Sequence, residues 1–99
     1  MNKQNKQIGI KLKNKLISYR NDVDRLDKEL IKLFKKRFLL ALKIWKIKKP
    51  LKMKIKNPKR EKEIIDKITK ESGFNRKFVK RLYSVIFEES RIIQKQGVK

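Results

Sequence analysis

The chain has 99 residues, of which 31 are lysine or arginine and 10 are aspartate or glutamate, so its formal net charge at pH 7 is +21. Such a charge favours an anionic partner, whether nucleic acid, an acidic membrane or a small metabolite. The sequence has no cysteine and no histidine, which excludes disulfides, thiolate chemistry, the usual zinc sites and catalysis by imidazole. It also has no apolar run of membrane-spanning length and no apolar segment near Met1, so we expect a cytoplasmic protein of one domain.

The first predicted element is a very long helix over residues 13–49. A 3.6-residue apolar pattern runs through it without proline or glycine, and Pro50 ends it. At 1.5 Å per residue this helix would be roughly 50 Å long, whereas a compact globule of this chain length is about 30 to 35 Å across. One chain cannot cover such a stripe, so we expect an intertwined homodimer. Residues 1–12 are polar and basic, with Gly9 as a breaker, and are expected to form a flexible arm.

A second, shorter helix is predicted to begin after a loop over residues 50–57. Asn57 is a favoured N-cap residue, and Pro58 is well tolerated at the first helical position. The apolar pattern continues to about Glu71, and Gly73 supplies a C-terminal stop. The loop carries alternating apolar side chains, which can turn Ile55 inward.

A third helix is predicted from Asn75, as its cap, to about Gln96. No internal repeat or strand-like stretch of useful length occurs. The fold class is therefore all-α, with one very long N-terminal helix and two shorter ones. The apolar stripe of the third helix comprises Phe78, Val79, Leu82, Tyr83, Ile86, Phe87, Ile92 and Ile93.

Three cations lie on or beside the apolar face of the first helix. Arg37 and Lys48 fall inside that face at about 100° per residue, and Arg20 lies on its shoulder. A charge turned toward a core must be paired or hold a ligand, because an unpaired one is strongly unfavourable. We interpret these three residues as the wall of an anion pocket. The apolar face itself comprises Leu16, Val23, Leu26, Leu30, Leu33, Phe34, Leu40, Ala41 and Ile44.

The two shorter helices add polar groups to this inventory. Arg60 and Glu61 occur in the first turn of the second helix, where free backbone N–H groups favour anions. Ser90 and Gln94 occur one turn apart on the third helix. Together these residues indicate a pocket for a small polyanion that carries a hydroxyl, and they include no evident nucleophile–base pair.

In its order and spacing, this series resembles the all-helical (type II) class of chorismate mutase from Tyr19 to Gln96. The resemblance assigns residues 13–97 to a chorismate mutase domain. The segments that carry it are Tyr-Arg-Asn-Asp-Val-Asp-Arg-Leu-Asp from Tyr19, Leu-Phe-Lys-Lys-Arg to Arg37, Ala41 to Lys48, Lys-Asn-Pro-Lys-Arg-Glu to Glu61, and Glu-Glu-Ser-Arg-Ile-Ile-Gln to Gln94.

The resemblance implies a Claisen rearrangement of chorismate to prephenate, in phenylalanine and tyrosine biosynthesis, with no cofactor and no metal. Arg37 and Arg20 would hold the two substrate carboxylates, with Arg20 supplied by the partner chain of the homodimer. Lys48 and Gln94 would flank the ether oxygen, which gains negative charge as its C–O bond breaks. These four residues are the catalytic candidates.

Four further residues are assigned to substrate binding by the same resemblance. Glu61 would accept a hydrogen bond from the ring hydroxyl of the substrate, and Ser90 would contact a substrate carboxylate. Arg60 would support this part of the pocket wall. Asn57 stands where the family usually has an acidic residue. Because asparagine still caps the helix, a changed affinity is expected there more than a lost activity.

The residues taken singly leave other interpretations open. Arg37 would then form an internal ion pair with Glu61 or Asp27, and Lys48 would be a surface lysine near a helix end. Alternative functions are an isochorismate-pyruvate lyase of the same fold and a basic helical dimer that binds nucleic acid. Nucleic acid is disfavoured because the lysines are dispersed and the distinctive arginines face inward. A mutase domain joined to a dehydratase or dehydrogenase is also compatible with the sequence.

Overall fold

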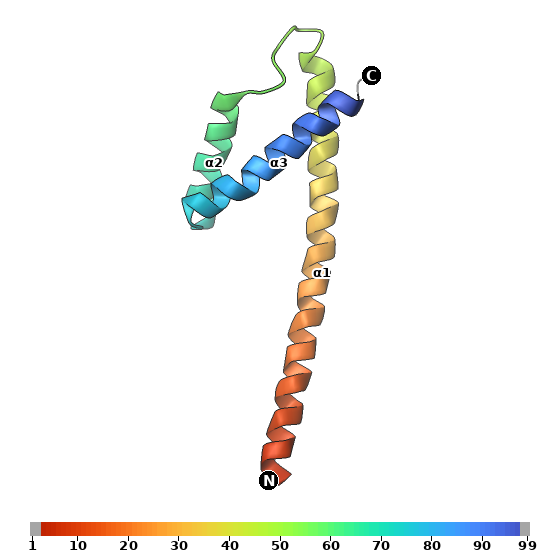
Figure 1. Cartoon of the computed structure of the whole chain (residues 1–99), viewed down its shortest axis with the longest axis vertical. Helices are drawn as coiled ribbons and strands as arrows, with labels where there is room; N and C mark the ends of the chain where they lie inside the picture. The colour runs from red at the N-terminus through yellow and green to blue at the C-terminus, as the bar shows by residue number, and fades with distance from the viewer. Residues whose placement is uncertain (1–2, 98–99) are drawn as a thin grey trace. The chain divides into compact units, whose positions relative to one another are not determined.

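The computed structural model describes residues 3–97, and all of their regular structure is helical. The three helices are α1 (Lys3–Lys48), α2 (Pro58–Ser72) and α3 (Arg76–Gly97), shown in Figure 1. The all-α prediction with one very long helix is confirmed. The chain divides into two units, Met1–Lys36 and Arg37–Lys99, and the boundary between them falls within α1. No helix in residues 3–97 combines the length and apolarity that a membrane crossing needs.

The predicted start of the first helix is wrong, because α1 begins at Lys3 and has 46 residues. Gly9 lies inside the helix rather than before it. One glycine costs about 1 kcal/mol relative to alanine, and the lysine, glutamine, isoleucine and leucine residues around it have much better helix propensities. Residues 3–12 of the predicted flexible arm are therefore helical, and its residues 1 and 2 lie outside the described part of the chain.

In the unit Met1–Lys36, α1 exposes the apolar stripe that its sequence predicted. Each of its large aliphatic side chains is about half exposed or more within a single chain. Burying such side chains is the main favourable term in both folding and association. The exposed stripe therefore supports the expectation of a second chain, and the homodimer itself stays a prediction. The residues of this stripe are Leu16, Val23, Leu26, Leu30 and Leu33.

In the unit Arg37–Lys99, polar side chains cap the two shorter helices as predicted. Asn57 Oδ1 accepts a hydrogen bond of 3.1 Å from the backbone N–H of Arg60, which starts α2. Gly73 ends α2 in the left-handed conformation, with φ of 71°. Asn75 Oδ1 accepts a hydrogen bond of 2.8 Å from the backbone N–H of Lys77, which starts α3. These caps fix where both helices begin.

The buried residues of this unit lie where α3 faces its neighbours. Val79, Ile86 and Phe87 of α3 are buried, as is Ala41 of α1. The C-terminal half of α3 lies against the last turns of α1, and its N-terminal end adjoins α2 (Figure 1). This crossing brings the end of α1, the start of α2 and the last turns of α3 to one place.

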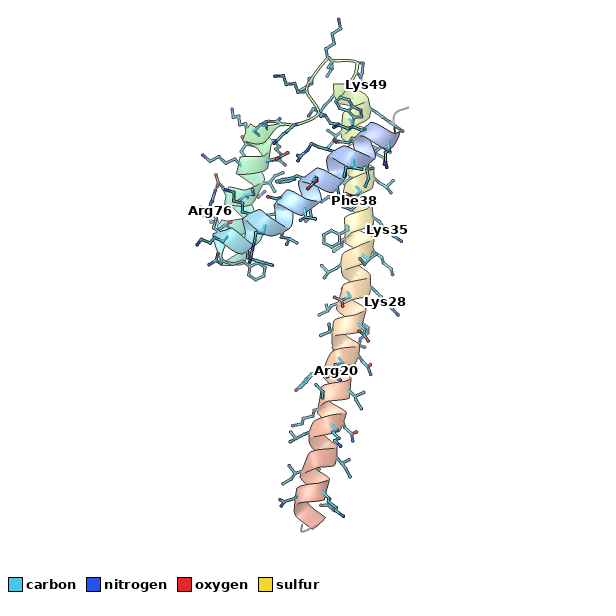
Figure 2. The ribbon with its side chains drawn as sticks, viewed as in Figure 1. Arg20, Lys28, Lys35, Phe38, Lys49 and Arg76 are labelled. Carbon is cyan, nitrogen blue, oxygen red and sulfur yellow. The ribbon has the colours of Figure 1, made fainter. Side chains whose placement is uncertain are left out.

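An ion pair joins α2 to α3 near the turn between them. Arg76 Nη2 lies 2.6 Å from Asp66 Oδ1, and Figure 2 labels Arg76 at this corner. Both side chains are about half exposed, at 52% and 48%. Exposed pairs of this kind contribute little to stability. The position of α3 therefore depends mainly on its buried apolar face.

Candidate active site

A cavity of about 300 Å³ lies within the unit Arg37–Lys99. Its walls come from the last three turns of α1, the loop after it, the start of α2 and the C-terminal half of α3. The apolar part of the wall includes Ala41, Ile44 and Phe87. The polar part comprises Arg37, Lys48, Asn57, Arg60, Glu61, Ser90, Arg91 and Gln94.

Arg37 is held between α1 and the aromatic residues of α3. Its guanidinium carbon lies 5.8 Å from the ring centroid of Tyr83 and 5.6 Å from that of Phe87, within the range of cation–π attraction. Arg37 Nη1 also donates a hydrogen bond of 3.4 Å to Ser90 Oγ. It forms no ion pair within residues 3–97, so the alternative in which it pairs internally with a carboxylate is wrong. Its charge is thus available to a ligand.

Ser90 is buried and its hydroxyl is used within α3. Ser90 Oγ donates a hydrogen bond of 2.8 Å to the carbonyl of Ile86, one turn earlier, while it accepts from Arg37. A hydroxyl carries a single hydrogen. With that hydrogen on a carbonyl and no histidine in the sequence, Ser90 is not activated as a nucleophile.

Lys48 is the last residue of α1, and its ammonium group is tied to the loop that follows. Lys48 Nζ donates a hydrogen bond of 3.3 Å to the carbonyl of Ile55. The side chain of Ile55 is half-buried, which agrees with the prediction that it turns inward. The lysine is half-buried and lines the cavity, so it does not extend freely into solvent. An ammonium group has three donors, and this contact uses one of them.

Gln94 is the most buried amide of the site, with 7% of its surface exposed. Its Nε2 donates a hydrogen bond of 2.8 Å to the carbonyl of Ala41, which links α3 to α1. The amide nitrogen carries two hydrogens in a plane, so this contact fixes the direction of the second one. Gln94 therefore presents an oriented, uncharged donor in the cavity wall.

The start of α2 contributes Asn57, Arg60 and Glu61. Asn57 uses its side-chain oxygen to cap the helix. The Arg60 guanidinium lies 3.7 Å from Glu63, and both side chains are largely exposed, so this pair is weak. Glu61 is the one carboxylate among the residues that line the cavity.

Arg91 is the site residue that the sequence interpretation missed. Its Nη1 lies 2.6 Å from Glu61 Oε2, and each side chain is 23% exposed. One signal could have found it, because Arg91 is one of only seven arginines and is three residues before Gln94, on the same face of α3. Its carboxylate partner is on another helix, however, and helical periodicity does not predict such a pairing.

Seven of the eight predicted site residues line the cavity: Arg37, Lys48, Asn57, Arg60, Glu61, Ser90 and Gln94. The eighth, Arg20, is an exposed residue of α1 in the unit Met1–Lys36, labelled in Figure 2, and the role predicted for it requires a second chain. Within residues 3–97, no group of three carboxylate, imidazole or thiol side chains is placed to hold a metal ion.

The fold and the cavity define an all-helical protein that can hold a small polyanion. Arg37, Lys48, Arg60 and Arg91 supply four cations against the single carboxylate of Glu61. Guanidinium groups grip carboxylates through two parallel hydrogen bonds, which suits a ligand with carboxylate groups. The remaining donors of Lys48 and Gln94 can stabilise a charge that develops on a ligand oxygen.

Residues 19–95 match the family described as chorismate mutase type II. A chorismate mutase of Methanocaldococcus jannaschii is 32% identical over 85 residues, which cover 83% of this chain and 86% of that relative. The chain therefore belongs to the type II chorismate mutase family, and the resemblance stated from the sequence is confirmed.

Other relatives are bifunctional chorismate mutase/prephenate dehydratases of Buchnera aphidicola. The protein from subspecies Schizaphis graminum is 34% identical over 87 residues, which cover 85% of this chain and 23% of the relative. The protein from subspecies Baizongia pistaciae is 34% identical over 91 residues, which cover 89% of this chain and 24% of the relative. The chain thus spans about a quarter of the length of these bifunctional relatives. No solved structure gives a significant match.

Proposed function

We propose that this chain catalyses the rearrangement of chorismate to prephenate, a step toward phenylalanine and tyrosine. One observation carries the proposal: seven residues that the family resemblance assigns to substrate binding or catalysis line a single cavity in a member of that family. We also infer that the protein acts in the cytoplasm, and the absence of cysteine agrees with a reducing compartment.

The chemistry of the reaction agrees with the groups in the cavity. In a Claisen rearrangement one C–O bond breaks while one C–C bond forms within the same molecule, and no proton is transferred. Catalysis therefore comes from holding the reactive conformer and from donors aimed at developing charge. In the proposed mechanism Lys48 and Gln94 donate to the ether oxygen. The proposal is supported by their geometry, since each is fixed by one carbonyl and keeps at least one further donor.

The two carboxylates of the substrate require two cationic positions. We assign one to Arg37, with Ser90 beside it, because this guanidinium is oriented by Tyr83 and Phe87 and has no carboxylate partner within residues 3–97. We assign the other to Arg20 of a second chain in a homodimer. Support for this comes from the exposed apolar stripe from Leu16 to Leu33, beside which Arg20 lies.

The ring hydroxyl of the substrate is assigned to Glu61. Its side chain is the one carboxylate among the lining residues, and one of its oxygens already contacts Arg91. Arg60 and Asn57 complete this wall through the first turn of α2. The family usually has an acidic residue at Asn57, and the amide keeps the capping role without adding negative charge near a dianion.

The test is to add chorismate to the purified chain and to follow both its loss and the appearance of prephenate. Isochorismate and a labelled DNA duplex serve as controls for the alternative functions. Prephenate formation that depends on the chain supports the proposal. Release of pyruvate from isochorismate without any prephenate would favour the lyase, and a DNA shift without turnover would favour nucleic-acid binding.

A further inference from the structure

Glu61 is a carboxylate placed among cations, and it is paired with only one of them. The cavity also presents Arg37, Lys48 and Arg60, yet within residues 3–97 Glu61 forms an ion pair with Arg91 alone, at 2.6 Å. Both members of the pair are 23% exposed, so solvent screens them less than a surface pair. The contact uses Nη1 of the arginine and Oε2 of the carboxylate, which leaves Oε1 as a free acceptor with respect to the described residues.

A carboxylate without a partner of its own would weaken this cavity as an anion site. Opposite charges attract strongly at short range when they are partly shielded from water. Glu61 would then neutralise one of the cations that an anionic ligand needs. Arg91 holds the Glu61 carboxylate from the side of α3, so the carboxylate does not compete with the ligand for the other cations. The same contact fixes the direction of the second carboxylate oxygen.

We propose that Arg91 is a positioning residue that acts through Glu61. It holds the carboxylate against α3, so that the free oxygen meets a ring hydroxyl at one fixed place, and it keeps Arg37 and Lys48 available for the anionic groups. The inference rests on the proposed function, because the hydroxyl in question belongs to chorismate. It adds a specificity role, since a substrate whose hydroxyl is on another ring carbon, as in isochorismate, does not meet a fixed acceptor.

The experiment compares three variants of the full chain by steady-state kinetics with chorismate. Arg91→Gln removes the charge, Arg91→Lys keeps it, and Arg76→Gln is the matched control. Arg76 also joins α3 to an acidic residue of α2 at 2.6 Å, but it lies outside the cavity lining. A contact made equally in the ground state and the transition state changes KM more than kcat. We therefore expect Arg91→Gln to raise KM about tenfold with little change in kcat, the scale of one charge-assisted hydrogen bond.

The conservative variant and the control separate positioning from a structural role. Arg91→Lys should keep most of the affinity that Arg91→Gln loses, because an ammonium group can still reach the Glu61 carboxylate, although it lacks the planar geometry of a guanidinium. Arg76→Gln should leave KM unchanged. Binding of isochorismate, measured as competitive inhibition, should weaken much less than binding of chorismate in Arg91→Gln, so that the ratio of the two affinities falls.

A double-mutant cycle tests whether Arg91 acts through Glu61. In the Glu61→Gln background, Arg91→Gln should have almost no further effect on KM. If the single variant Arg91→Gln does not fold, the double variant is compared with Glu61→Gln alone, and any clear rise in KM between these two counts against the proposal. A full, additive effect in that background would overturn the proposal, since Arg91 would then act on the substrate directly.

The remaining outcomes distinguish this inference from the proposed function. If the unmodified chain makes prephenate but Arg91→Gln keeps its KM, the inference alone is wrong. If the unmodified chain makes no prephenate, the proposed function fails and the inference falls with it. A raised KM in Arg76→Gln equal to that in Arg91→Gln would show a general effect of α2–α3 ion pairs and would also overturn the inference.

Discussion

Lys48 and Gln94 illustrate how main-chain carbonyl groups can aim side-chain donors. The lysine is held by the carbonyl of Ile55, and the glutamine by that of Ala41. Each contact consumes one donor and reduces the freedom of the others. Preorganised donors stabilise a developing charge better than mobile ones because they do not reorient during the reaction.

Replacing Lys48 with alanine should remove most of the turnover and leave the fold intact. The change deletes a charged donor from the cavity wall, and losing one such donor lowers kcat by about a hundredfold or more. Kinetics with chorismate measure the loss, and circular dichroism and thermal melting check the fold. Lys46→Ala is the matched control, because Lys46 is exposed on the same turn of α1 and lies outside the cavity lining. Unchanged turnover in Lys48→Ala would contradict the role proposed for it.

Replacing Gln94 with glutamate should move the optimum of activity toward acid pH. A carboxyl group donates a hydrogen bond only when it is protonated, whereas an amide donates at any pH. At neutral pH the carboxylate would also face the carbonyl oxygen of Ala41, so thermal stability should fall as pH rises. The pH profile of kcat and the melting temperature measure both effects, with Gln96→Glu on the exposed side of α3 as the control. A profile equal to that of the unmodified chain would show that Gln94 does not donate to the substrate.

At the scale of the elements, a single polar residue caps the start of each short helix. Asn57 and Asn75 each accept a hydrogen bond from a backbone N–H of the helix that follows. Only α2 carries cavity residues in its first turn. The cap at Asn57 therefore supports both the helix and the position of Arg60 and Glu61.

The two caps provide a matched pair of variants. Asn57→Ala and Asn75→Ala should each lower the free energy of unfolding by about 1 kcal/mol, the usual cost of a lost N-cap. Only Asn57→Ala should also reduce kcat/KM, because its helix start forms part of the cavity. Urea denaturation and kinetics on the same samples measure the two effects. Equal loss of activity in both variants would indicate a general loss of stability instead.

At the scale of the whole molecule, most of the apolar surface of the first unit has no cover within one chain. The stripe from Leu16 to Leu33 is exposed, and Ala41, the one buried residue among residues 5–48 of α1, lies in the second unit. An isolated helix with such a stripe is not expected to be stable in water without a partner. The homodimer proposed above would cover this stripe and would bring Arg20 to a cavity.

Mixing two inactive variants tests this shared site. Arg20→Ala and Arg37→Ala chains should each be nearly inactive, because every cavity lacks one cation. After unfolding and refolding together, half of the dimers should be mixed, and each mixed dimer has one intact cavity, so about a quarter of the activity should return. The measurement is the chorismate mutase activity of the refolded mixture, as a fraction of that of an equal amount of the unmodified chain. No recovery would indicate that each cavity is built from a single chain.

The sequence predicted most of the cavity because helical periodicity determines which residues share a face. Arg37 and Lys48 on α1, and Ser90 and Gln94 on α3, were placed together by spacing and by the family resemblance. The observed start of α1 differs from the predicted one because a single glycine does not break a helix whose neighbouring residues have good helix propensity. The pair between Glu61 and Arg91 was missed because it depends on the angle between two helices, which a sequence pattern does not contain.

The hydroxyl of Ser90 has a further consequence for binding. Its only hydrogen already points to the carbonyl of Ile86, so toward an incoming carboxylate the oxygen presents lone pairs and would repel it. The hydroxyl must rotate about its C–O bond and break its hydrogen bond to the carbonyl of Ile86 before it can donate to an anion. In the role proposed for Ser90, binding of a carboxylate would therefore exchange one acceptor of the hydroxyl for another, and most of the attraction would come from the neighbouring guanidinium of Arg37.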